Sequence, residues 1–330
     1  MARFNLFSKH PDNRWTQIIC LMVIVFVAVL LYKRVYNPNK YEGFEQNQRY
    51  VVKRDDQVYD DFYATLYDNI VKPEKRADFE MTQIINWTQP SKDHSIFLDV
   101  GCGTSHLTHK LQSRGYAVQG LDKSQAMIDN ALEKYPGLSL TCGDATIPMT
   151  FDKGSFTHIL CTYMTIYQFK DKVEFFRNCY YWLRMSGYLI IHLVDKDKFD
   201  PIMPAGQSML MESPQQYSET RITNTHIDFV DFKYRASYDF SKAQGSASTN
   251  GWNTIMGGSN ANNQVLFREK MTDTVTNNVR ENEQTLYMDS LPEILSIAQY
   301  CGFILQGQVS MNEGGSGDKH QYLVVFERPM

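Results

Sequence analysis

The sequence lacks the residue patterns of a metal site and of a disulfide framework. Its six cysteines, in 330 residues, form no close pairs and no metal-like spacing. It also lacks a basic majority outside the first forty residues, where 27 Lys and Arg stand against 36 Asp and Glu. Because a phosphate backbone binds basic side chains, nucleic acid is not expected as the main substrate. The unpaired cysteines agree with a reducing compartment.

Apolar residues are plentiful. Hydrophobic residues make up 43% of the chain and aromatic residues 13%, which is enough for a sizeable core and excludes wholesale disorder. The length allows one large domain or two ordinary ones.

One long uncharged run lies near the start of the chain, after a basic tail at residues 1–14. From Trp15 to Tyr32 the sequence has no charge, and Arg and Lys flank both ends. This length is at the short end of the range for a membrane span, and the two aromatic residues suit the membrane interfaces. We therefore expect a transmembrane helix at residues 15–36, with a cleaved signal peptide or a buried core helix as alternatives. A polar tether is expected at residues 37–56.

The stretch from Leu98 to Ser105 predicts a strand, a tight turn and the start of a helix. Gly101 and Gly103 can adopt backbone angles closed to other residues, and they let a ligand approach the main chain. The free N–H groups of the helix start would then face that ligand. A dinucleotide fingerprint would have glycine where His106 stands, and a phosphate loop would end in Lys-Ser/Thr. A glycine turn without a ligand is the alternative from this stretch alone.

Polar residues also end the strands that follow. Three further apolar runs come at helix-sized spacing, at residues 117–121, 138–142 and 156–161. The first ends at Asp122, which is placed to accept hydrogen bonds from two ribose hydroxyls. The second ends at Gly143 and Asp144, and the third leads to Tyr163. Ligands bind beyond the carboxyl ends of parallel strands, so we expect these residues to line one site.

The motif Asp99-x-Gly101-x-Gly103, followed by the motif Gly-Leu-Asp122-x-Ser-x-x-Met127, resembles the motifs of class I S-adenosylmethionine-dependent methyltransferases. The resemblance implies an α/β fold with a Rossmann-like, mostly parallel seven-stranded sheet whose last strand is antiparallel. It also implies S-adenosylmethionine as cofactor, with its methionine part over the glycine turn and its adenine near Asp144. The implied cofactor-binding residues are Asp99, Gly101, Cys102, Gly103, Asp122, Lys123, Met127, Asp144, Ala145, Cys161 and Tyr63.

The resemblance covers a predicted methyltransferase domain at residues 57–330. A helix with an aromatic face is predicted over 58–70, and methyltransferases of this kind often begin with a helix lying over the cofactor. Alternation in 225–232 and 265–268 predicts antiparallel strands within an acceptor-side insert at 195–285. Residues 241–263 are rich in Ser, Gly and Asn and predict a loop or a lid.

The predicted reaction is methyl transfer to a nitrogen or oxygen of a small-molecule or membrane-proximal acceptor by in-line displacement. The candidate catalytic residues are His192, Tyr163 and Tyr167, although His192 also suits a hydrogen-bonded core position. A general base is required only if the acceptor arrives protonated. A cofactor-binding module without turnover is the alternative function, and a nicotinamide-dependent oxidoreductase is a further one. Because the methyl donor is made in the cytosol, we expect a single-pass membrane protein with a cytosolic catalytic domain.

Overall fold

The computed structural model describes residues 14–35, 48–206, 213–243, 263–313 and 318–330. The chain divides into two compact units, which are residues 1–42 and 43–330. The predicted basic tail lies almost entirely outside the described residues, as do most of the predicted tether and residues 244–262 of the predicted lid.

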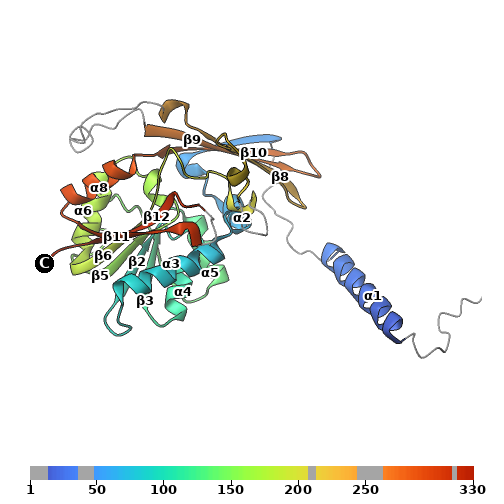
Figure 1. The fold of residues 1–330 in the computed structure, drawn as a ribbon, viewed down its shortest axis with the longest axis horizontal. Helices are drawn as coiled ribbons and strands as arrows, with labels where there is room; N and C mark the ends of the chain where they lie inside the picture. Colours follow the sequence, from blue (N-terminus) through green and yellow to red (C-terminus); the bar gives the residue numbers. More distant parts are fainter. Residues whose placement is uncertain (1–13, 36–47, 207–212, 244–262, 314–317) are drawn as a thin grey trace, which may run out of the picture. The chain divides into compact units, whose positions relative to one another are not determined.

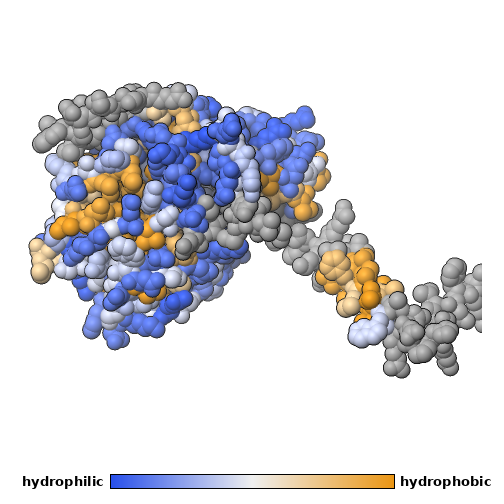
Figure 2. All heavy atoms as spheres, viewed as in Figure 1, coloured by the Kyte–Doolittle hydropathy of each residue, from blue (hydrophilic) through white to orange (hydrophobic). Residues whose placement is uncertain are grey.

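Helix α1 (Arg14–Val35) coincides with the predicted transmembrane segment. Apolar side chains are exposed along its described part, among them Ile24 and Phe26, and Figure 2 shows this hydrophobic surface. Among the described residues, however, no helix combines the length and the apolarity that a membrane crossing requires. The predicted span at residues 15–36 is therefore not supported.

The second unit contains a seven-stranded sheet in the order β11-β12-β6-β5-β2-β3-β4 (Figure 1). The strands β4, β3, β2, β5 and β6 are parallel, and β12 runs antiparallel between β6 and β11. This arrangement confirms the predicted Rossmann-like, mostly parallel sheet with an antiparallel last strand. The strands are β2 (Ile96–Val100), β3 (Ala117–Asp122), β4 (Ser139–Cys142), β5 (Phe156–Cys161), β6 (Leu183–Val194), β11 (Ile304–Ser310) and β12 (Gln321–Glu327).

Helices cover both faces of this sheet (Figure 1). Helices α3 and α4 contact each other on one side, and α6 and α8 contact each other on the other side. Apolar side chains of α3 and α4 pack on the sheet around Phe97 and Ile190. Because the sheet is covered on both faces, the central strand β6 is buried from Leu189 to Val194. The helices are α2 (Asp61–Val71), α3 (Pro73–Thr88), α4 (His106–Ser113), α5 (Gln125–Lys134), α6 (Lys172–Trp182) and α8 (Leu291–Tyr300).

A second sheet of five strands, in the order β1-β10-β9-β8-β7, forms the predicted insert. Its strands are β1 (Tyr50–Arg54), β7 (Asn224–Asp228), β8 (Phe232–Asp239), β9 (Gln264–Asp273) and β10 (Val279–Tyr287). Strands β7 to β10 are antiparallel, as predicted, and β1 adds to the edge of β10 in parallel. The outer surface of this region is largely hydrophilic (Figure 2).

Strand β1 corrects the prediction of a tether through residue 56. Tyr50 to Arg54 pair with Val279 to Glu283, and a short 3₁₀ helix, η3 (Asp55–Gln57), follows directly. The free edge of β10 offers hydrogen-bond partners to a short β-branched segment, so this segment extends the sheet. The polar linker can therefore extend no further than residue 49.

Candidate functional site

Two adjoining cavities lie at the carboxyl ends of the parallel strands, where ligands of such sheets bind. The first has a volume of about 370 Å³ and extends under the five-stranded sheet. The second has a volume of about 410 Å³ and lies toward β4. Residues common to both cavities are Asp56, Gly101, Asp122, Lys123, Thr165 and Gln168. A single elongated ligand can therefore occupy both.

The glycine turn forms the floor between the two cavities. The N–H groups of Gly101 and Cys102 donate to the carbonyl of Leu121 at 2.7 and 3.2 Å, which ties the turn to β3. Gly101 has a φ of +67°, and a Cβ at this position would lie 2.4 Å from the Cγ2 of Thr165. Only glycine fits this backbone beneath the 3₁₀ helix η4 (Thr165–Gln168).

Asp122 stands at the junction of the cavities. Its Oδ2 accepts a hydrogen bond from the N–H of Gly103 at 2.8 Å, and its Oδ1 accepts one from the N–H of Ser124 at 2.9 Å. Burial raises the pKa of this carboxyl, while these backbone donors oppose the rise. The backbone N–H of Lys123 also acts on this carboxyl. Because a carboxylate has about four acceptor sites, it can still accept hydrogen bonds from ligand hydroxyls. This arrangement suits a vicinal diol.

Lys123 joins the rim of the sheet to the segment that precedes α2. Its Nζ lies 2.8 Å from Asp56 Oδ2 and 3.1 Å from Asp144 Oδ2. Asp144 also accepts bonds from the N–H and the hydroxyl of Thr146, at 2.9 and 2.7 Å. Although burial opposes it, these donors together lower the pKa of Asp144. The second cavity thus has a fixed carboxylate at its edge.

Aromatic rings form the wall of the first cavity. They come from α2 and the residue before its N-cap, from the loop after β5 and from the inner face of the five-stranded sheet, and they are Tyr59, Tyr63, Tyr67, Tyr163, Tyr238 and Phe267. On α2, Tyr63 makes edge-to-face contacts with Tyr59 and Tyr67, at centroid distances of 5.6 and 5.9 Å. The Arg76 guanidinium lies 3.7 Å from the ring centroid of Tyr163. Such a wall suits an apolar or cationic ligand.

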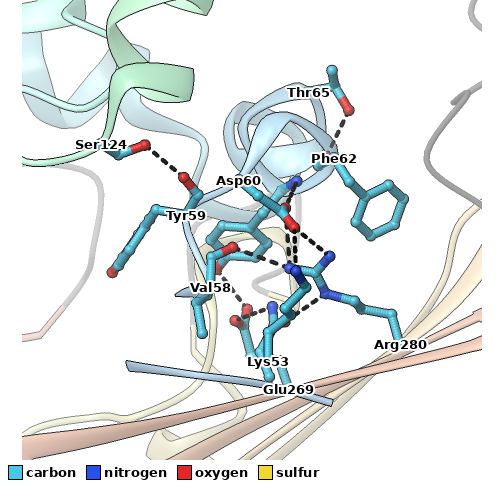
Figure 3. Close-up of polar contacts among 11 residues, drawn as sticks. Lys53, Val58, Tyr59, Asp60, Phe62, Thr65, Ser124, Glu269 and Arg280 are labelled. Atoms are coloured by element: carbon cyan, nitrogen blue, oxygen red, sulfur yellow. Dashed lines mark hydrogen bonds and ion pairs between the residues drawn. The ribbon is translucent and has the colours of Figure 1, made fainter. Parts of the chain in front are cut away.

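The start of helix α2 is fastened to the five-stranded sheet and to the N-cap of α5 (Figure 3). Its N-cap residue Asp60 accepts bonds from both terminal nitrogens of Arg280 in β10, at 2.8 and 3.0 Å. On the other side, the hydroxyl of Ser124 donates to the carbonyl of Tyr59 at 2.5 Å. The tyrosines of α2 are thus held over the glycine turn.

Most of the predicted cofactor-binding residues line the cavities. The first cavity includes Gly101, Gly103, Asp122, Lys123, Met127 and Tyr63, and the second includes Asp144 and Ala145. Asp99, Cys102 and Cys161 line neither cavity, and their contact with the cofactor stays a prediction. Asp99 is buried behind the turn and accepts a bond from the Thr108 hydroxyl at 2.7 Å, because its strand ends under α4.

Of the three predicted catalytic residues, Tyr163 lines the first cavity, and His192 and Tyr167 line neither of the two. His192 is fully buried, its Nδ1 accepts a bond from the N–H of Met164 at 3.3 Å, and its Nε2 lies 3.0 Å from Gln321 Oε1. Burial lowers the pKa of His192 to about 3, so it is a neutral core histidine. Tyr167 is also fully buried, and its hydroxyl accepts a bond from the N–H of Val194 at 2.8 Å. Neither His192 nor Tyr167 is retained as a catalytic candidate.

The sequence reading missed the residues that the five-stranded sheet brings to the first cavity. Tyr238 comes from β8, Phe267 from β9, and Gln284 and Leu286 from β10. Behind them lies Glu269, a fully enclosed carboxylate. The signal was present in the alternation of β9, where Glu269 stands at a position that otherwise carries buried apolar residues.

Comparison with known proteins agrees with this geometry. Residues 98–191 match the family described as a methyltransferase domain. The biotin biosynthesis bifunctional protein BioHC of Cellvibrio japonicus is 31% identical over 83 residues, which are 25% of this chain and only 16% of that protein.

Solved structures match over most of the chain. The CcbJ methyltransferase of Streptomyces caelestis has a TM-score of 0.57 at 14% identity, over 83% of this chain and 98% of that one. An S-adenosylmethionine-dependent methyltransferase of Clostridium acetobutylicum has a TM-score of 0.56 at 15% identity, over 81% and 98%. Both of these proteins are described as methyltransferases, and the second as S-adenosylmethionine-dependent. The chain thus has the Rossmann-like fold of class I methyltransferases and carries a methyltransferase domain match at residues 98–191.

Proposed function

We propose that this chain catalyses methyl transfer from S-adenosylmethionine to a small-molecule acceptor, on nitrogen or oxygen. The observation that carries the proposal is the junction of two cavities at Gly101 and Asp122, one bordered by a carboxylate and the other walled by aromatic rings. When bound, S-adenosylmethionine would supply a methyl group on a positively charged sulfur.

The residues present fit this cofactor. Asp122 can accept hydrogen bonds from the ribose hydroxyls, and Gly101 and Gly103 bring the main chain to the wall of the first cavity beside it. Asp144 and Ala145 border the second cavity, where they would contact the adenine. Met127 and Tyr63 line the first cavity.

The aromatic wall would exclude water and orient the acceptor. Burial is the main cause that raises the pKa of Tyr59, Tyr63 and Tyr163, so their hydroxyls keep their protons and act as donors. Holding both reactants in line at contact distance contributes several kcal/mol to a transfer of this kind. We assign no general base among the lining residues.

Isothermal titration with S-adenosylhomocysteine tests the cofactor site in the full chain. In the variant Asp122→Asn we expect affinity to fall by about tenfold or more, because a charge-assisted hydrogen bond to the diol is lost. Asp129→Asn is the matched control, since Asp129 is an exposed carboxylate in the same βα unit and lines neither cavity. Absence of binding to the unaltered chain, or equal affinity in both variants, would contradict the proposal.

Turnover requires a second measurement. The chain is incubated with a small-molecule extract and methyl-labelled donor, and labelled products are identified by mass. A labelled small molecule supports the proposed reaction. Binding of the cofactor without any labelled product would instead favour a binding module without turnover.

We also infer that the catalytic domain lies in the cytosol, because its methyl donor is made there. External protease applied to intact cells tests this placement. A domain that resists the protease until the cells are lysed supports it, and cleavage in intact cells contradicts it.

A further inference from the structure

Glu269 is a buried carboxylate that the proposed reaction does not yet use. It lies on the inner face of β9, beneath α2, with 1% of its surface exposed (Figure 3). Its partners across the sheet are Ala236 in β8 and Asn282 in β10. The small side chain of Ala236 leaves room for the carboxylate on this face.

In each of its side-chain hydrogen bonds, Glu269 is the acceptor and its partner is the donor. Its Oε1 accepts bonds from the hydroxyls of Tyr63 and Tyr234, at 2.8 and 2.7 Å. Its Oε2 accepts a bond from the side-chain amide of Asn282 at 3.3 Å. An ionised carboxylate accepts hydrogen bonds and donates none. Burial raises the pKa of Glu269, and these three donors, together with the charge of Arg280, oppose that rise and stabilise the charged form.

No cation in the described part of the chain forms an ion pair with Glu269. The nearest candidate, Arg280, directs its two terminal nitrogens at Asp60 and its Nε at Asn282 Oδ1, at 2.9 Å. The charge of Arg280 is thus matched by Asp60, and Asn282 stands between Arg280 and Glu269. The negative charge of Glu269 is held by neutral donors.

Tyr63 connects Glu269 to the first cavity. Its hydroxyl donates a hydrogen bond to Glu269, and the residue itself lines the cavity. Besides burial, the charge of Glu269 contributes to raising the pKa of tyrosines that surround the cavity, including Tyr59, Tyr163 and Tyr238. The described charged residues that line the cavity are Asp56, Asp122 and Lys123. Lys123 is paired with two carboxylates, and Arg76, which lies against the Tyr163 ring, is 3.6 Å from Glu80 Oε1. Among the described residues, this wall therefore offers no unpaired cation to an anionic acceptor.

We propose that the acceptor carries a positively charged amino group, and that Glu269, acting through Tyr63, determines this specificity. Aromatic faces attract a desolvated cation, and a carboxylate directly behind them strengthens the attraction in a low-dielectric site. Glu269 is a positioning and specificity residue, because it lines no part of the first cavity itself. The inference rests on the proposed methyl transfer, since it names the class of acceptor for that cavity.

Two probes of equal shape test the charge preference. Choline carries a quaternary ammonium, and 3,3-dimethylbutan-1-ol is its uncharged isostere. Both are titrated calorimetrically into the full chain with saturating S-adenosylhomocysteine, which has no charge on sulfur. We expect choline to bind about tenfold more tightly than the isostere.

The variants assign the preference to Glu269. Glu269→Gln keeps the shape and removes the charge, and we expect it to abolish the preference for choline while S-adenosylhomocysteine binds as before. Tyr63→Phe removes the hydroxyl that links the cavity to Glu269, and it should reduce the preference. Tyr234→Phe is the matched control, because it removes a bond of similar length to the same oxygen from a residue that does not line the cavity, and it should keep the preference.

The outcomes separate this inference from the proposed function. If S-adenosylhomocysteine binds but neither probe binds, or both bind equally, the inference is wrong and the proposed methyl transfer stands. It is also wrong if Glu269→Gln leaves the preference intact, or if it weakens only the binding of S-adenosylmethionine, because the charge then serves the sulfonium. If S-adenosylhomocysteine itself does not bind, the proposed function fails first.

Discussion

At the rim of the seven-stranded sheet, the polar contacts join residues that are close in the sequence, whereas under the five-stranded sheet they join residues from opposite ends of the domain. Asp122 bonds the N–H of Gly103, 19 positions away, and of Ser124, its second neighbour. Tyr63 bonds Glu269 across 206 positions, and Arg280 bonds Asp60 across 220. The rim is therefore specified by short motifs, and the acceptor side by tertiary structure.

The largest effect is expected from a substitution in the glycine turn, at the rim of the seven-stranded sheet. In Gly101→Ala the new Cβ would lie 2.4 Å from Thr165 Cγ2, at a positive φ. Backbone strain and overpacking together should lower the free energy of unfolding by about 2–4 kcal/mol, and binding of S-adenosylhomocysteine should be lost. Gly137→Ala is the control, because its φ of +92° brings the same strain while no atom lies within 4 Å of the Cβ. Stability is measured by urea unfolding. Equal losses in Gly101→Ala and Gly137→Ala would contradict close packing of Gly101 against Thr165.

The next largest effect is expected from the long-range contacts under the five-stranded sheet. Arg280→Met removes the two-bond partner of Asp60 at the start of α2 and leaves only the partly exposed Lys53, 3.6 Å away, and we expect a loss of about 1–3 kcal/mol in the free energy of unfolding. Arg268→Met on the outer face of the same sheet should cost less than about 1 kcal/mol, because Arg268 is half-exposed beside Glu283. Urea unfolding measures the loss of stability in both variants, and equal losses would mean that the buried contact of Arg280 contributes no more than the exposed one of Arg268.

A third test asks whether Asp99, the buried carboxyl behind the glycine turn, affects the stability of the fold rather than the binding of the cofactor. Burial raises the pKa of Asp99 from 3.8 to about 7. Between these values the folded state binds more protons than the unfolded state, so stability falls as the pH rises from about 4 to about 7. The slope from one such group is at most about 1.4 kcal/mol per pH unit. Asp99→Asn should remove this part of the slope, measured by urea unfolding across that range, and an unchanged slope would contradict the assignment.

The smallest effect concerns the link between the two regions. Lys123 is more than half exposed and pairs with Asp56 and Asp144. Lys123→Met should change the free energy of unfolding by less than about 1 kcal/mol, because exposed ion pairs contribute little. The difference should shrink further in high salt, which screens exposed charges. A larger change that persists in salt would show that this link is structurally essential.

The fold of the rim could be predicted because each element leaves a local pattern. The glycines of the turn, the acid that ends β3 and the apolar runs between helices all lie within about a hundred residues. The sequence does not mark which of these side chains face the cavity. Asp99 belongs to the motif, yet it lies under α4 and bonds Thr108, because successive strand residues point to opposite faces.

The acceptor side could be predicted only in outline. Alternation indicated antiparallel strands, but nothing in Tyr50 to Arg54 indicates that this segment pairs with β10, more than two hundred residues away. For the same reason His192 suggested a base, since its bond to Gln321 in β12 cannot be read from the strand that carries it. The role of Tyr163 and the identity of the acceptor stay predictions.

The pairing of β1 with β10 also constrains how the protein is made. A chain emerging from the ribosome presents β2 to β6 long before Val279 to Glu283 become available to Tyr50 to Arg54. During synthesis, therefore, α2 must wait for its partner Arg280, whereas the strands that lead to Gly101, Asp122 and Asp144 have already been made. A translation stall before residue 279 should yield a nascent domain that recognises the nucleoside and has no closed acceptor chamber.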